Sequence, residues 1–178
     1  IHSKQSSYVA LRIIKEGRTG YALTTELGDR QSLVANAVET AEFGMKAEFE
    51  LPPRTSYPRV EVFDRRVEPV TIEEMVRLGE ELISAVRNHT PDIICDAEVL
   101  KETISTRIIN SHGGEVGYEQ TIFSLSLAGQ LIRDTDMLFV GESQSSCRSL
   151  LEPKAITEVV LQRLKLAKNH ASVSSQPL

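Results

Sequence analysis

Strand-like and helical patterns of hydrophobic residues alternate along the chain, beginning with two strand-like runs. Residues 8–16 and 21–25 are rich in β-forming side chains, and residues 17–20 between them have turn composition. This arrangement predicts a β-hairpin. Over residues 29–43 the apolar side chains recur at helical spacing, and Gly44 stands where the C-terminal cap of a helix is expected.

The next part of the chain combines a proline-rich stretch with a strongly marked helix. Residues 45–70 contain four of the seven prolines, and prolines remove main-chain donors and break helices. They predict an extended surface arm in which residues 60–63 form an edge strand. Thr71 and Glu74 then have capping-box spacing, and the apolar stripe behind them predicts a helix to about Asn88.

A strand-like period replaces the helical one from residue 92 to about residue 142. Phe123, Leu125 and Leu127 alternate with serines, as expected for a sheet with one buried face. Residues 111–114 predict one hairpin turn, and residues 128–129 predict another turn or a bulge. Three or four antiparallel strands therefore follow one another as a meander. A final helix is predicted from residue 153, where proline occupies a favoured first-turn position.

The order of these elements predicts an α+β fold. We expect a mainly antiparallel sheet, made of the hairpin and the meander, with about three helices packed on one face. The length of 178 residues, of which 40% are hydrophobic, suits a single domain over residues 1–170. The polar residues 171–178 predict the start of a linker to a missing C-terminal domain.

Charge and composition exclude several classes of partner. The net charge is −5 and no basic cluster occurs, which argues against binding to nucleic acid. No uninterrupted apolar run exceeds four residues, whereas a membrane span needs about 20 and a signal-peptide core about 7. Two cysteines do not make a disulfide framework, which favours a cytoplasmic location.

The histidines do not predict a metal site. They stand at positions 2, 89, 112 and 170, no two of them at zinc-binding spacing, and no Cys-x-x-Cys pair exists. A site assembled from distant residues is the alternative. His89 and His170 are instead expected to end helices, where a ring that can become positively charged suits the helix dipole, and His112 is expected to lie in a turn.

The remaining reactive groups have structural interpretations. Cys147 lies in a polar sequence beside Arg148 and could act as a nucleophile, but an ordinary loop cysteine is the preferred interpretation. Cys95 is expected in the core. The glycines of residues 17–20 and 111–114 open no helix, so they predict turns rather than a phosphate site.

One small basic patch is predicted on the first hairpin. Arg12, Lys15 and Arg18 could together hold a carboxylate or the acidic edge of a partner. The preferred interpretation is that Arg12 has a structural partner and that the other two are surface charges. No catalytic residue is predicted anywhere in the chain.

Several segments, taken in order, resemble the N-terminal domain of the TldD/PmbA family. This family is named for modulation of DNA gyrase, and its members are known mainly as metalloproteases. The matching segments are residues 11–22, 37–41, 57–58, 71–74, 109–113 and 166–168. The chain lacks the helix and strand usual at the start of that domain. The matching motif positions, all expected to be structural, are Arg12, Gly17, Gly20, Asn110, Ser111 and Gly113.

The resemblance implies a function that this chain does not perform alone. The family's zinc site is a His-Glu-x-x-x-His motif later in the protein, and no His-Glu pair occurs here. No catalytic residue or metal ligand is therefore carried over, and zinc is expected only in the missing C-terminal domain. The family pairs a zinc-bearing subunit with a zinc-free one, and the pair cleaves unstructured peptides. The expected partners are the chain's own C-terminal domain, a second subunit in a homo- or heterodimer, and a peptide substrate.

Two alternatives stand beside this hypothesis. The chain could be a regulatory module that docks on another protein without any proteolysis, gyrase modulation being one version. It could also be a stand-alone enzyme that uses Cys147.

Overall fold

The chain forms two compact units in the computed structural model, which describes residues 1–133, 136–149 and 152–168. The first unit takes residues 1–54 and 110–114, and the second takes residues 55–109 and the described residues from 115 onward. The sequence predicted one domain over residues 1–170, whereas the described residues divide between these two units. The predicted linker at residues 171–178 and the histidine at position 170 lie outside the described residues.

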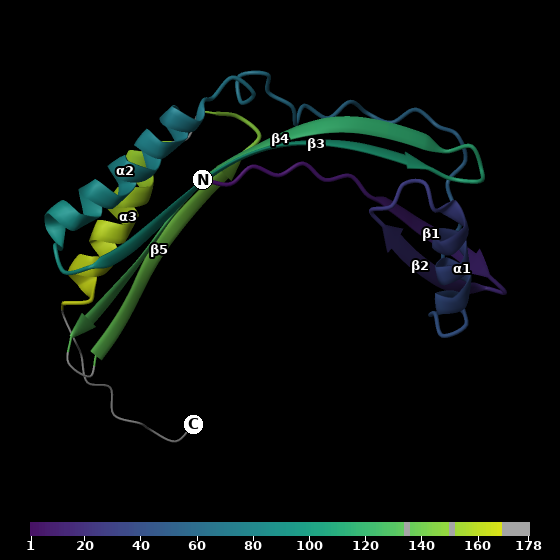
Figure 1. Cartoon of the computed structure of the whole chain (residues 1–178), viewed down its shortest axis with the longest axis horizontal. Helices are drawn as coiled ribbons and strands as arrows, with labels where there is room; N and C mark the ends of the chain where they lie inside the picture. The colour runs from purple at the N-terminus through teal and green to yellow at the C-terminus, as the bar shows by residue number, and fades with distance from the viewer. Residues whose placement is uncertain (134–135, 150–151, 169–178) are drawn as a thin grey trace. The chain divides into compact units, whose positions relative to one another are not determined.

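The α+β class predicted from the sequence is confirmed. The described residues form three helices, a two-stranded sheet and a three-stranded sheet, and both sheets are antiparallel (Figure 1). One feature of the prediction differs from the structure. The first hairpin does not join the meander in one sheet, because it pairs only with itself and has its own helix.

The first unit is a hairpin with a helix packed on it. Strands β1 (Val9–Lys15) and β2 (Arg18–Thr24) pair with Lys15 opposite Arg18, so the turn consists of Glu16 and Gly17 rather than residues 17–20. Both turn residues have positive φ, 51° and 73°, as the favoured two-residue hairpin turn requires.

Helix α1 (Arg30–Ala41) packs on this hairpin through small residues. It begins at Asp29, whose side chain accepts the Ser32 N–H at 3.0 Å, and it buries Ala37 and Ala41. Gly44 does not form the predicted left-handed cap. The helix ends at Glu42 in right-handed conformation, and Gly44 instead passes so close to β2 that a Cβ atom would lie 1.8 Å from the Thr19 oxygen.

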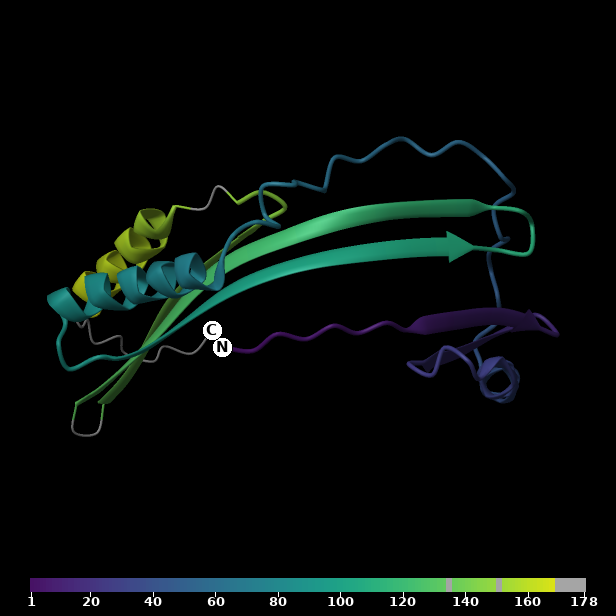
Figure 2. The ribbon, with the colours of Figure 1, turned by 45° about the horizontal axis from the view of Figure 1, so that its top comes forward.

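The second unit is built on a meander of three strands, with β4 in the middle (Figure 2). They are β3 (Ile94–Ile109), β4 (Glu115–Arg133) and β5 (Asp136–Ser146). The turn or bulge predicted at residues 128–129 is wrong, because both residues lie inside β4 and pair with β3 and β5 in unbroken register. Gly129 is required there for another reason: its Cβ would lie 2.8 Å from Cδ1 of the buried Ile93.

Helices α2 (Ile72–His89) and α3 (Pro153–Leu166) cover one face of this sheet (Figures 1 and 2). The predicted capping box is present, with Thr71 N donating to Glu74 Oε2 at 2.8 Å and Glu74 N to Thr71 Oγ1 at 3.2 Å. The alternation predicted for β4 is confirmed as well. The core combines aliphatic side chains with one phenylalanine: Val67, Leu82, Val86, Ile93, Phe123, Leu125, Leu127, Leu131, Val140, Ile156, Val160 and Leu164.

The arm before α2 is fastened to β4 by a buried threonine. Residues 60–63 form no regular strand, although the Val62 carbonyl oxygen accepts the Thr121 N–H at 3.0 Å. The Thr121 hydroxyl accepts the Asp64 N–H at 2.9 Å and donates to the Cys147 carbonyl oxygen at 2.7 Å. Thr121 lies just beyond the last residue of β4 that pairs with β5. Beyond the end of β5, the arm therefore supplies the hydrogen-bonding partner for the edge of β4.

Candidate functional site

The motif positions on the first hairpin occupy structural places. The Arg12 guanidinium lies over the ring of Phe49, 4.8 Å from its centroid, a cation–π contact of the kind that stabilises exposed sites by about 0.5–1 kcal/mol. Gly17 forms the turn. Gly20 faces α1, where a Cβ would lie 2.0 Å from the Ala37 carbonyl oxygen. Arg12 has the structural partner that the sequence predicted. The prediction that Lys15 and Arg18 are only surface charges is wrong, because Arg18 Nη1 donates to the Gly44 carbonyl oxygen at 2.9 Å and Lys15 Nζ lies 3.8 Å from Glu42 Oε1.

The second group of motif positions forms the turn between β3 and β4. The Asn110 side chain accepts the N–H groups of His112 and Gly114 at 2.9 and 3.0 Å, and it donates to the Pro52 carbonyl oxygen at 2.9 Å. Gly113 has a φ of 81°, which favours glycine. Ser111 is exposed, with no side-chain hydrogen bond to any described residue. The turn predicted at residues 111–114 is confirmed, and Asn110 organises it.

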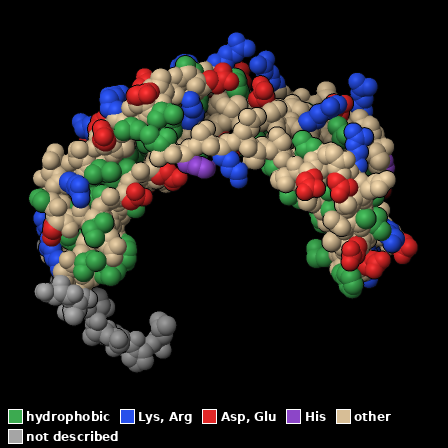
Figure 3. All heavy atoms as spheres, viewed as in Figure 1, with side chains coloured by type: hydrophobic (Ala, Val, Ile, Leu, Met, Phe, Trp, Pro, Cys, Tyr) green, Lys and Arg blue, Asp and Glu red, His purple; other side chains and the backbone are tan. Residues whose placement is uncertain are grey.

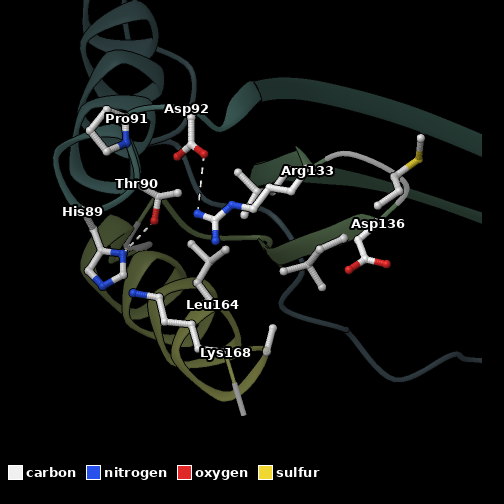
Figure 4. A pocket seen from close by; sticks show the side chains of 12 residues that line it. His89, Thr90, Pro91, Asp92, Arg133, Asp136, Leu164 and Lys168 are labelled. Atoms are coloured by element: carbon white, nitrogen blue, oxygen red, sulfur yellow. Dashed lines mark hydrogen bonds and ion pairs between the residues drawn. The ribbon is translucent and has the colours of Figure 1, made fainter. Parts of the chain in front are cut away.

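The best-formed cavity lies in the second unit, where the C-terminal ends of α2 and α3 meet the β4–β5 hairpin (Figure 4). Its volume is about 480 Å³. Leu131 and Leu164 form an apolar floor, both of them buried. Its remaining described lining is His89, Thr90, Pro91, Asp92, Arg133, Asp136, Met137, Leu138, Ala167 and Lys168.

The charged groups at the rim of this cavity pair loosely or not at all. Arg133 and Asp92 approach to 3.4 Å, and the His89 Nδ1 lies 2.8 Å from the Thr90 hydroxyl (Figure 4). Asp136 forms no ion pair with a described residue. The cavity has the size of small-ligand pockets. His89 and Thr90 bring an imidazole and a hydroxyl together in this lining, but no described carboxylate hydrogen-bonds the ring to orient it, as the third group of a catalytic triad does.

The thiols and the potential metal ligands are dispersed. Cys95 is half-buried against the core, and burial raises the pKa of its thiol, opposed in part by Arg87. Cys147 follows directly on β5, where its carbonyl oxygen binds Thr121. Within residues 1–133, 136–149 and 152–168, no three His, Cys, Asp or Glu side chains are grouped to hold a metal ion. None of the helices formed by these residues is long and apolar enough to span a membrane.

The sheet of the second unit also has a face that its helices leave uncovered, which we call the open face. It consists of alternate residues of the three strands, in phase opposite to the core: Ile94, Asp96, Glu98, Leu100 and Glu102 on β3, Ser124, Ser126, Ala128, Gln130 and Ile132 on β4, and Met137, Phe139, Gly141, Ser143 and Ser145 on β5. The sequence pattern does not predict this face. Both phases of β3 contain apolar residues, so its alternation does not separate a buried side from an exposed one.

The two edges of the same sheet differ. On β5 the Arg163 guanidinium, reaching over from α3, donates to the Gly141 carbonyl oxygen and to Glu142 Oε2. On the other side β3 has no strand partner among the described residues, and its 16 residues pair only with β4. The outer edge of β3 therefore offers a longer row of unpaired main-chain groups than the edge of β5 does.

Comparison with known proteins defines the class of protein to which this fold belongs. The model of the PmbA/TldA metallopeptidase central domain matches residues 65–168, which is more than half of the chain. The chain therefore belongs to the PmbA/TldA metallopeptidase family. The resemblance found in the sequence is confirmed at the level of the family. The sequence motifs suggested its N-terminal domain, whereas the matched residues correspond to the central domain.

The individual relatives are distant and longer. An uncharacterized protein of Methanocaldococcus jannaschii is 25% identical over 168 residues, covering 92% of this chain and 36% of the relative. The crystal structure of TldE from Thermococcus kodakarensis has a TM-score of 0.66 at 18% identity, covering 91% of this chain and 38% of that one. A candidate modulator of DNA gyrase from Bacteroides thetaiotaomicron has a TM-score of 0.71 at 16% identity, covering 88% and 38%. This chain thus spans little more than a third of these proteins.

Proposed function

We propose that this chain is a non-catalytic part of a metallopeptidase of the PmbA/TldA type, or of the zinc-free subunit that pairs with one. The observation that supports the proposal is the match of residues 65–168 to the central domain of that family. Zinc and its His-Glu-x-x-x-His ligands would belong to a C-terminal domain of the same protein. That domain and a second subunit, in a cytoplasmic homo- or heterodimer, would be its partners, and unstructured peptides would be the substrates.

The chain would contribute by holding the peptide in an extended conformation. The outer edge of β3 supports this role, because it has no strand partner among the described residues over its whole length. A peptide that adds to a sheet edge is bound mainly through its own main chain, so its sequence matters little. The β5 edge is less suited, since Arg163 already occupies the Gly141 carbonyl oxygen.

The test compares the full-length protein with this 178-residue chain. Both are assayed on a fluorogenic unstructured peptide, with and without a chelator, and their zinc content is measured. We expect chelator-sensitive hydrolysis by the full-length protein, alone or after addition of its partner subunit, and neither zinc nor hydrolysis in the short chain. Hydrolysis by the short chain alone, or a full-length protein that stays inactive with every family subunit of its organism, would contradict the proposal.

A second candidate is a regulatory module that docks on another protein without proteolysis. Two of the structural neighbours are named as candidate modulators of DNA gyrase, and the open face offers a surface for docking. The sequence after this chain separates the two proposals. A following domain with the His-Glu-x-x-x-His motif favours proteolysis, and one without it favours docking or the zinc-free subunit.

A further inference from the structure

The open face carries a cluster of large apolar side chains at the end of the sheet near the β4–β5 hairpin. Ile94, Gln130 and Phe139 stand side by side across the three strands, and Ile132 and Met137 form the next pair. The four apolar members are 51–68% exposed. Figure 3 shows hydrophobic side chains on the surface of the unit that carries β5. Exposed apolar residues that lie in adjacent rows of one face mark an interaction site more often than scattered ones do.

A hollow lies next to this cluster, because small residues follow it on β4 and β5. Ala128 lies opposite Gly141, and Ser126 lies opposite Ser143. Together with Asp96, Glu98, Leu127, Glu142 and Arg163 these residues line a depression of about 490 Å³ that crosses the sheet. The apolar cluster lies one row away from the hollow on the same face, and the carboxylates of Asp96 and Glu98 line the β3 side of the hollow.

The charge of the open face has a single sign. Asp96, Glu98 and Glu102 are exposed, and none of them has an ion pair or a hydrogen bond with a described residue. The strand residues of the open face include no lysine, arginine or histidine. Arg163, which comes from α3 and also lines the hollow, is already bound to the Gly141 carbonyl oxygen and to Glu142. A second copy of this face, or an anionic surface, would bring like charges together, which is unfavourable. A cationic side chain near the apolar cluster would meet two unpaired carboxylates, those of Asp96 and Glu98, whereas Glu102 lies four rows from Ile94.

We propose that the open face binds a segment of another polypeptide in which a bulky apolar side chain is followed, two to four residues later, by lysine or arginine. Residues on one face of a strand are about 7 Å apart along it. The Asp96 row lies one such step from the Phe139 row, and the Glu98 row lies two steps away. An extended segment spans these distances in about two and four residues. The apolar side chain packs on Phe139, and the stem of the basic residue crosses the hollow to the carboxylates.

The binding test uses the 178-residue chain and two labelled peptides of the same length. One repeats Phe-Ser-Lys-Ser, and the other has glutamate in place of each lysine. We expect the first to bind, with fluorescence anisotropy rising to saturation, and the second to bind at least about tenfold more weakly. Added salt should weaken the first complex severalfold, because the carboxylates are exposed.

Matched variants locate the site. Asp96→Asn with Glu98→Gln should weaken binding at least about fivefold and reduce its salt dependence. Phe139→Ala should weaken it by a similar factor. Glu80→Gln with Glu81→Gln makes the same change of charge on the exposed side of α2 and should leave binding unchanged. Thermal unfolding of every variant shows that the chain is still folded.

The proposal would be overturned by equal binding of the two peptides, by equal weakening in the α2 control, or by binding that the full-length protein does not share. The last would mean that the rest of the parent protein covers the open face. Concentration-dependent dimerisation abolished by Phe139→Ala would also overturn it, in favour of a second copy. Binding is measured without turnover, so a full-length protein that cleaves nothing would refute the peptidase proposal and leave this inference standing.

Discussion

Gly20 of β2 and Ala37 of α1 approach so closely that a Cβ atom on Gly20 would lie 2.0 Å from the Ala37 carbonyl oxygen and 2.8 Å from the Ala41 Cβ. The obstacle is largely main chain, so helix and hairpin would have to move apart to admit a methyl group. Only glycine allows this packing. Gly20 is therefore required for packing against α1, whereas Gly17 forms the turn.

Gly20→Ala should destabilise the first unit by about 1–3 kcal/mol, the usual cost of overpacking. Urea denaturation followed by circular dichroism measures the change. Gly28→Ala is the control, because a Cβ there meets nothing within 4 Å, and it should stay within about 0.5 kcal/mol of the parent chain. Equal effects of the two substitutions would show that the close approach is not maintained in solution.

Thr121→Val should be strongly destabilising although the two side chains have nearly the same shape. Thr121 is 1% exposed, and its hydroxyl serves both the Asp64 N–H and the Cys147 carbonyl oxygen. Leaving such buried groups unpaired costs about 1–3 kcal/mol. Thr121→Ser keeps the hydroxyl and should lose less. If valine and serine lowered the free energy of unfolding equally, the hydrogen bonds would not be the cause.

Asn110→Ala should destabilise the chain by about 1 kcal/mol or more, because three hydrogen bonds depend on that side chain. Ser111→Ala, at the next position of the same motif, should have almost no effect. Chemical denaturation of both variants provides the comparison. An effect at Ser111 as large as that at Asn110 would indicate a role for the serine hydroxyl that the structure does not explain.

The stability of the fold should depend less on acid pH in the Asp64→Asn variant than in the parent chain. Hydrogen bonds from the side chain and main chain of Arg66 hold the pKa of the Asp64 carboxyl below its usual value. A carboxyl whose pKa is lower in the folded state stabilises the fold above its unfolded pKa, about 3.9 for aspartate. That contribution is lost as the pH falls through the folded-state pKa. The difference between urea midpoints at about pH 7 and about pH 3 should therefore shrink in the variant. A difference between the two midpoints as large in Asp64→Asn as in the parent chain would show that the Asp64–Arg66 contact is not the cause.

Cys95 should react slowly in the folded chain. Burial raises the pKa of its thiol, and only the thiolate is a good nucleophile. Alkylation by iodoacetamide, followed by peptide mass spectrometry, should be at least about tenfold slower for Cys95 in native buffer than in urea. Equal rates would mean that the β3 face carrying Cys95 opens readily.

Much of the fold could be predicted from local patterns. The capping box at Thr71 and the alternation of Phe123, Leu125 and Leu127 each depend on neighbours in sequence, and both predictions are confirmed. Glycine was the main source of error. Gly44 and Gly129 were assigned to a cap and a turn, but each is needed because a distant segment passes close to it. Such contacts between distant residues leave no periodic signal.

The candidate surfaces could not be predicted for a related reason. The motif positions Asn110 and Arg12 stand out by residue type, and both have structural partners. The open face depends instead on the register that places Ile94 in one row with Phe139. Residues so far apart in sequence become neighbours only once the pairing of three strands is fixed.

The contact of Arg163 with β5 has two structural effects. The same guanidinium that fastens α3 to the sheet also occupies the outward carbonyl of Gly141. A chain truncated before α3 would consequently expose its apolar core, and it would also expose the main-chain hydrogen-bonding groups at the edge of β5. That combination favours aggregation, so the last described helix protects the protein from self-assembly as well as completing its interior.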